Sequence, residues 1–190
     1  MAKVYEFLAN GFEEVEALAP VDILRRGGVE VKTISVTGNH LVESSHGVTI
    51  KADLLFEEIS NFSDVDLLML PGGMPGSKNL NEHDGVRKAL KEQFESGKRV
   101  AAICAAPLVL ASVGLLKGKK ATIYPGMESY LGDDAEYTGV LVQEDGNVTT
   151  GGGPAASFPY AYKLLSYFIP QEKVEEIKKG MIYDRLISSK

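Results

Sequence analysis

Residues 100–107, Val100-Ala101-Ala102-Ile103-Cys104-Ala105-Ala106-Pro107, contain the only cysteine of the chain. An apolar run of strand length is followed at once by small residues, and a proline there suits the first turn of a helix. This order predicts a nucleophile elbow, in which a tight turn lifts one side chain to the rim of a sheet. Because the N-terminus of the next helix favours a thiolate, we expect the Cys104 pKa to fall below about 8.5.

The alternative to a reactive thiol is a buried structural cysteine, the commoner state of a lone cysteine in an apolar run. The strand–turn–helix context keeps both interpretations of Cys104 open. With a single cysteine, an intramolecular disulfide and a cysteine-rich zinc site are both excluded. The cysteine count also favours a reducing compartment.

On either side of the elbow, strand-length apolar runs alternate with segments of helical period, which predicts βαβ units and a mainly parallel sheet with helices on both faces. We expect one domain, residues 1–190, with a three-layer α/β/α sandwich. Pro20 predicts a kink or break in its helix, and residues 41–57 predict a hairpin around Ser44-Ser45-His46-Gly47. The expected strands are Val4–Leu8, Val29–Val36, Val65–Leu70, Val100–Ile103, Ala121–Tyr124, Val140–Gln143 and Asn147–Thr150, and the expected helices are Glu13–Arg26, Gly85–Ser96, Pro107–Val113, Ala155–Phe168 and Glu172–Leu186.

Three loops of interest follow strands of this sheet, after Leu8, after Leu70 and after Ile103. Parallel sheets bind ligands at the carboxyl ends of their strands. We therefore expect these loops to converge on one site.

The first of these loops leads into Glu13, Glu14 and Glu16. Acidic residues at a helix start usually complement the helix dipole, and we expect that role for at least two of the three. The third could point into the site, where burial beside a thiolate would raise its pKa. In its protonated form it could donate a hydrogen bond to the sulfur and move protons during chemistry. The pattern alone does not choose among them.

The second loop is the glycine-rich stretch Pro71-Gly72-Gly73-Met74-Pro75-Gly76. It lacks the Lys-Ser/Thr of a phosphate loop, and neither it nor Gly151-Gly152-Gly153-Pro154 fits the dinucleotide fingerprint, so we expect no cofactor. The backbone N–H groups of Gly73 and Ala105 are candidates for an oxyanion hole beside Cys104. The alternative is an ordinary turn.

Charge and composition restrict the partners. The chain has 26 acidic and 20 basic residues and a net charge of −6, which disfavours nucleic acid and anionic membranes. The apolar runs are shorter than the ~20 residues of a membrane span. Met1-Ala2-Lys3 leads directly into a strand, so we expect no signal peptide and a cytoplasmic location. His40, His46 and His83 are not spaced for metal binding, so we expect no metal site.

Four motifs, taken together, resemble the ThiJ/PfpI superfamily, with the closest likeness to its branch of parkinsonism-associated protein deglycase and bacterial ThiJ-like proteins. The likeness covers essentially the whole chain. The motifs are Gly11-Phe12-Glu13-Glu14-Val15-Glu16, Leu70-Pro71-Gly72-Gly73, Ala101-Ala102-Ile103-Cys104-Ala105-Ala106-Pro107, and Gly153-Pro154 leading into Ser157-Phe158.

The resemblance implies a flavodoxin-like sandwich, similar to class I glutamine amidotransferase domains, and a homodimer. It implies that Cys104 is the nucleophilic, oxidation-prone cysteine and that Glu16 is the protonated acid beside it. It also matches Gly73 and Ala105 to backbone donors near the sulfur, and Asp22, Arg26 and the Ser45-His46 loop to the dimer interface.

Two departures from the family bear on the reaction. The deglycase branch has a histidine where this chain has Tyr124, and the PfpI peptidase branch has a histidine where this chain has Ala105. A cysteine peptidase needs a base to activate its thiol, so this function is disfavoured. His46 stands where a well-known relative has arginine, so substrate binding by His46 near the interface is expected to differ.

These features give two leading functional hypotheses. The first is a cofactor-independent deglycase- or glyoxalase-type hydrolase or lyase that acts on small reactive carbonyls or early glycation adducts, with Tyr124 in the cleft and modest activity. The second is an oxidation-sensing stress-response protein or chaperone that uses Cys104. A PfpI-type cysteine peptidase is the third.

Overall fold

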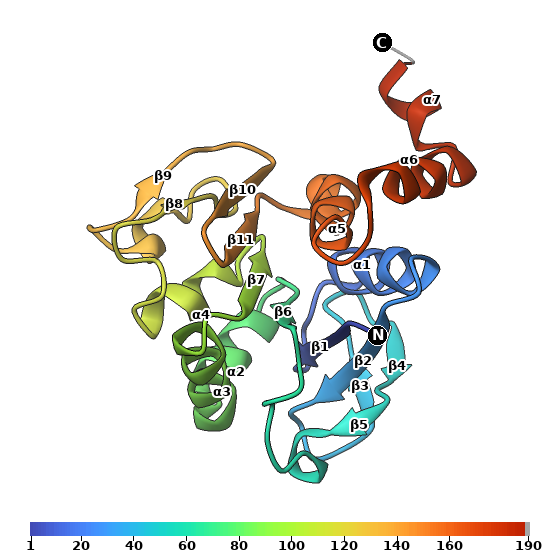
Figure 1. The fold of residues 1–190 in the computed structure, drawn as a ribbon. Helices are drawn as coiled ribbons and strands as arrows, with labels where there is room; N and C mark the ends of the chain where they lie inside the picture. The colour runs from blue at the N-terminus through green and yellow to red at the C-terminus, as the bar shows by residue number, and fades with distance from the viewer. Residues whose placement is uncertain (189–190) are drawn as a thin grey trace.

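The computed structural model describes residues 1–188, which form a mainly parallel seven-stranded sheet with helices on both faces (Figure 1). The strand order is β10-β11-β7-β6-β1-β2-β5, and only the β10–β11 pair is antiparallel. The strands of this sheet are β1 (Lys3–Leu8), β2 (Glu30–Ser35), β5 (Leu54–Leu55), β6 (Leu67–Leu70), β7 (Arg99–Ile103), β10 (Val142–Asp145) and β11 (Val148–Gly151). The expected α/β/α architecture is confirmed.

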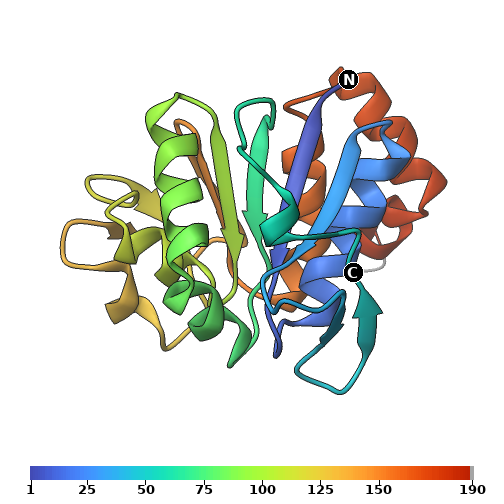
Figure 2. The ribbon, with the colours of Figure 1, turned by 90° about the horizontal axis from the view of Figure 1, so that it is seen from below.

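The helices divide between the two faces, as Figures 1 and 2 show. One face carries α1 (Glu14–Arg26), α5 (Ser157–Leu165) and α6 (Gln171–Gly180), and the other carries α2 (Gly76–Glu82), α3 (Asp84–Glu95) and α4 (Pro107–Ser112). The remaining elements are α7 (Tyr183–Ser188) and the 3₁₀ turns η1 (Phe56–Glu58), η2 (Glu128–Leu131) and η3 (Pro154–Ala156). None of the helices within residues 1–188 combines the length and the apolar character that crossing a bilayer requires.

Each face of the sheet has its own apolar core, and strand β1 contributes side chains to both cores. Tyr5 and Phe7 pack toward α3 and α4, whereas Val4 packs toward α1 and α5. This alternation follows from the two-residue period of a strand. Glu6 breaks the apolar pattern, because it lies on the α1–α5 face and is buried.

Two small sheets lie outside the main one. The hairpin expected in residues 41–57 is present, as β3 (Leu41–Glu43) paired antiparallel with β4 (Thr49–Lys51). The second sheet pairs β8 (Lys120–Ala121) with β9 (Glu136–Tyr137), a strand that the sequence pattern did not predict. The strand expected over 121–124 therefore ends early, since Pro125 follows and the chain turns away there.

Two helices differ from their predictions. Helix α1 runs without interruption from Glu14 to Arg26, so the break that Pro20 predicted as one alternative does not occur. The helix expected over 172–186 is divided into α6 and α7, because Ile182 adopts a left-handed conformation (φ 54°) that no helix accommodates.

Candidate active site

Cys104 occupies the turn between β7 and α4, as the nucleophile-elbow pattern predicts. Its φ is 62°, and it is one of two non-glycine residues within 1–188 with a positive φ. Its N–H donates to the Gly151 carbonyl at 2.8 Å, and its own carbonyl accepts from the Tyr124 N–H at 2.9 Å. These two bonds hold the backbone in a conformation that costs about 1–3 kcal/mol in isolation. The side chain lies at the carboxyl end of the central strands with 8% exposure.

Glu16 enters the site from the first turn of α1 and is completely buried (0% exposed). Glu13 is the N-cap of this helix, and its Oε2 accepts a hydrogen bond from the Glu16 N–H at 2.7 Å. The Glu16 side chain reaches across to the glycine-rich loop, where its Oε2 accepts the Gly72 N–H at 2.9 Å. Among the three glutamates, Glu16 is thus the one that points inward.

Gly72 is where Glu16 and Cys104 come together. A Cβ atom built on Gly72 would lie 2.5 Å from Glu16 Oε2 and 2.6 Å from Cys104 Cβ. Either distance is too short for any side chain at this position, so the glycine is what lets the acid and the thiol approach. The sequence pattern indicated close backbone approach in this loop but did not single out Gly72.

Glu16 and Cys104 each alter the pKa of the other. Burial raises the pKa of Glu16 to about 7, while the Cys104 side chain and the Gly72 N–H act to lower it. Burial raises the pKa of Cys104 to about 12, with a further rise from the adjacent Glu16 carboxylate. The expected pKa below about 8.5 is therefore wrong: burial and a neighbouring negative charge outweigh the helix N-terminus.

Two backbone donors oppose that rise. Hydrogen bonding from the N–H groups of Gly73 and Ala105 lowers the pKa of Cys104. When Glu16 is protonated, its repulsion disappears and only burial opposes these donors. Because the pKa of Glu16 is the lower of the two, the pair holds a single proton over a wide pH range, and in the free protein that proton lies on the Cys104 thiol beside an ionised Glu16.

Tyr124 lies next to Cys104 through the backbone, but its side chain is 46% exposed. It lines a groove of about 220 Å³ together with Tyr137, Leu141 and Gly153. Gly153 permits this packing, since a Cβ there would lie 3.3 Å from the Tyr124 ring. The groove is largely apolar, and Cys104 is not among the residues that line it.

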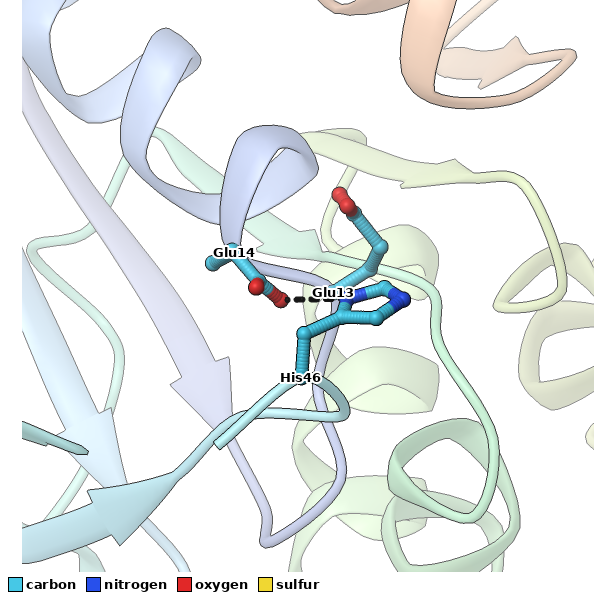
Figure 3. Close-up of side chains that lie close together, drawn as sticks. All are labelled: Glu13, Glu14 and His46. Carbon is cyan, nitrogen blue, oxygen red and sulfur yellow. Dashed lines mark hydrogen bonds and ion pairs between the residues drawn. The ribbon is translucent and has the colours of Figure 1, made fainter. Parts of the chain in front are cut away.

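His46 projects from the β3–β4 hairpin toward the start of α1 (Figure 3). Its Nδ1 lies 3.1 Å from Glu14 Oε2, and this hydrogen bond raises the pKa of His46. Glu13, Glu14 and His46 offer ligand atoms within 4.8 Å of one another, a cluster that the sequence spacing did not predict. Each carboxylate already has a partner within the protein, and Figure 3 shows the Glu13 carboxylate turned away from the Glu14–His46 pair. The hydrogen bonds of the His46 ring within residues 1–188 go to Glu14 and Ser45.

The other two histidines have structural contacts. His83 Nδ1 accepts the Val86 N–H at 3.1 Å and caps α3, while His40 Nδ1 lies 3.1 Å from the Ala52 carbonyl oxygen.

A nucleophile elbow on a parallel sheet, with a buried acid beside its cysteine, defines an α/β protein with a thiol–acid pair. Comparison with known proteins narrows this class: the chain belongs to the DJ-1/PfpI family, whose signature matches residues 2–167.

Similar proteins span nearly the whole chain. The Parkinson disease protein 7 homolog of Danio rerio is 36% identical over 177 residues, covering 92% of this chain and 94% of that protein. The deglycase PH1704 of Pyrococcus horikoshii is 36% identical over 165 residues, covering 86% of this chain and 97% of that protein. Among solved structures, oxidized Toxoplasma gondii DJ-1 superimposes with a TM-score of 0.91 at 33% identity, covering 96% and 98% of the two chains.

Proposed function

We propose that this protein is a cofactor-independent cysteine enzyme of the deglycase or glyoxalase type, which acts on small reactive carbonyls or early glycation adducts. The observation that carries the proposal is the approach of Glu16 and Cys104 over Gly72. A thiol and an acid that share one proton can attack a carbonyl and then move protons on the adduct. The similarity to a protein named as a deglycase supports the same class.

The proposed reaction with methylglyoxal balances without any oxidant. Ionised Glu16 takes the Cys104 proton as the sulfur adds to the aldehyde carbon, and Glu16 then gives that proton to the resulting alkoxide to form a hemithioacetal. Ionised Glu16 next removes the hydrogen from that carbon and returns a proton to the neighbouring carbon. The hydroxyl proton passes to the oxygen of the neighbouring carbon in the same isomerisation, so the adduct becomes a thioester with a hydroxyl group on the neighbouring carbon. Water, activated by Glu16, hydrolyses the thioester to lactate and releases Cys104.

Charge develops on oxygen in the addition and hydrolysis steps. The Gly73 and Ala105 N–H groups, which act on the sulfur in the free protein, are the donors we assign to that oxygen. Preorganised donors of this kind contribute about 10²–10³ in rate.

Lactate formation from methylglyoxal tests this function. We expect the wild-type protein to form lactate, and Cys104→Ser and Glu16→Gln to form it no faster than buffer alone. Equal rates for wild type and Cys104→Ser would show that the proposed enzyme does not exist.

A second candidate function is oxidation sensing. The observation that favours it is the pair of N–H groups at the Cys104 sulfur, because such donors also stabilise the negative oxygens of a sulfinate. We expect mild peroxide to add two oxygen atoms to Cys104, detected by mass spectrometry. An unmodified Cys104, under conditions that oxidise an ordinary thiol peptide, would exclude this role.

We also propose the homodimer that the family resemblance implies. Val15 and Leu18 are exposed on α1, and the ion pair of Asp22 with Arg26 follows along the same helix at 2.6 Å. Sedimentation should give a dimer for the wild type and a monomer for Leu18→Glu. A monomeric wild type at micromolar concentration would contradict this proposal.

A further inference from the structure

Glu6 is a buried acid for which the reaction above has no use. It lies in the middle of β1 with 1% exposure, and its Oε2 has no hydrogen-bond partner among residues 1–188. The register pairs it with Thr33 on one side and Met69 on the other. Because it follows Val4 by two residues, its side chain lies on the α1–α5 face, the face that Glu16 also occupies from α1.

Tyr160 on α5 belongs to the same layer. It is also 1% exposed, and its hydroxyl has no partner among the described residues. The same holds for Glu16 Oε1, the carboxyl oxygen that does not bind Gly72. These three groups from β1, α1 and α5, together with the Ser157 hydroxyl at the start of α5, are thus left without protein partners among the described residues.

Glu6 and Glu16 also affect Tyr160 electrostatically. Burial raises the pKa of Tyr160 well above its usual value, and the carboxyl groups of Glu6 and Glu16 both add to the rise. Burial also raises the pKa of Glu6, which Arg25 partly opposes. Tyr160 therefore responds to both acids.

The other charged and titratable groups around Glu6 already have partners. Arg25 on α1 binds Asp53 at 2.8 Å, and Asp53 in turn accepts the Thr33 hydroxyl at 3.0 Å. Tyr167, which follows α5, shares a hydrogen bond of 2.8 Å with Thr149. Neither arrangement supplies a partner for Glu6 Oε2 or the Tyr160 hydroxyl.

Buried polar groups in native proteins are almost always hydrogen-bonded, either to protein or to ordered water. An internal water typically joins two to four such groups. We propose that Glu6 is a positioning residue for Glu16: a buried acid that ordered water and the Tyr160 hydroxyl connect to Glu16 Oε1. The chain donates hydrogen bonds toward Glu16 and thereby stabilises its ionised form.

This inference rests on the proposed function at one point only, which is the role of Glu16 as the acid of the proposed active site. Its test reads the titration of Glu16 itself, so it can succeed or fail independently of enzyme activity. The measurement is a pH titration of the glutamate side-chain carboxyl carbons by NMR, with ¹³C-labelled glutamate. The Glu16→Gln spectrum assigns the Glu16 signal.

Two substitutions should break the chain at different points. In Tyr160→Phe and in Glu6→Leu, we expect the midpoint of the Glu16 titration to rise by about one pH unit. This rise corresponds to a tenfold tighter binding of the Glu16 proton. The double variant should rise no further, because both substitutions interrupt one chain. Glu6→Gln keeps a hydrogen-bond donor in the same volume and should restore a midpoint close to the wild-type value.

Tyr162→Phe is the matched control. It removes a tyrosine hydroxyl from the same helix, where that hydroxyl donates to Met181 Sδ at 3.4 Å, and should leave the Glu16 midpoint unchanged. The proposal is wrong if Tyr160→Phe leaves the midpoint in place, if the two substitutions are additive, or if Tyr162→Phe shifts it equally. Tyr160→Phe and Glu6→Gln preserve side-chain volume, so the test does not depend on the Leu variant folding.

Discussion

Glu16 and Cys104 meet across Gly72, which has no side chain to keep them apart. The Glu16 carboxylate accepts the Gly72 N–H at 2.9 Å, and a Cβ on Gly72 would lie 2.6 Å from Cys104 Cβ. The thiol–acid pair is therefore built on three segments, the start of α1, the loop after β6 and the end of β7.

Gly72→Ala should separate the pair. The added methyl must displace Glu16 Oε2, at 2.5 Å, or Cys104, and a displacement of this size costs about 10²-fold in activity. Lactate formation from methylglyoxal measures the loss. Gly180→Ala is the matched control, since a Cβ there would meet nothing within 4 Å. Full activity in Gly72→Ala would mean that close approach of the pair is not required.

Protein stability should depend on pH through Glu16. Its pKa is about 7 in the folded protein against an ordinary value of 4.5 for an exposed glutamate, so the folded state binds the proton more tightly. The resulting stabilisation is complete below pH 4.5 and is lost as pH rises through about 7. Over that range, Glu16→Gln should gain about 3 kcal/mol in unfolding free energy relative to wild type.

Urea denaturation of the two proteins at about pH 4 and about pH 8 measures this difference. Comparing them cancels the contribution of other acids, Glu6 included. A stability difference that is the same at both pH values would show that Glu16 titrates normally in the folded protein.

The reactivity of Cys104 should reveal the shared proton. In the wild type, we expect the rate of iodoacetamide alkylation to rise in two steps, because the pair loses two protons successively. Glu16→Gln removes the carboxylate that helps raise the Cys104 pKa to about 12. The alkylation rate of this variant should therefore rise in a single step, at a lower pH than the second step of the wild type. Superimposable profiles would rule out coupling between the two residues.

Tyr124→His should increase activity. The backbone at this position is held against Cys104, because the Tyr124 N–H donates to the Cys104 carbonyl at 2.9 Å, and we expect the smaller imidazole to turn from the groove toward the sulfur. A positioned general base contributes about 10²–10⁴ in rate, and we expect at least a tenfold gain in kcat. Tyr124→Phe, the control, should stay near wild type. No gain in the histidine variant would indicate that Glu16 already supplies all the proton transfer.

Local sequence patterns predicted much of this architecture. The elbow at Cys104 could be predicted because a strand, small residues and Pro107 are adjacent in the chain. The 41–57 hairpin and most strands followed from periodicity. The break between α6 and α7 could not be predicted, since nothing in the sequence marks Ile182 for a left-handed conformation.

The site was less predictable because its chemistry depends on contacts across the fold. The direction of the Cys104 pKa shift was predicted wrongly, since the pattern showed the helix N-terminus but not the burial or the nearby carboxylate. The sequence pattern itself left three glutamates open, and only their packing shows that Glu16 is the one that reaches Gly72. The role of Gly72 likewise depends on two partners remote in sequence.

The most direct test of the central claim, Cys104 addition followed by proton transfer through Glu16, is the reaction of methylglyoxal in D₂O, followed by proton NMR. We predict lactate that carries deuterium on its hydroxyl-bearing carbon, because the proton passes through an exchangeable acid. Its formation should disappear in Cys104→Ser. Lactate that retains the original aldehyde hydrogen on that carbon, or that forms equally fast with Cys104→Ser, would contradict the mechanism.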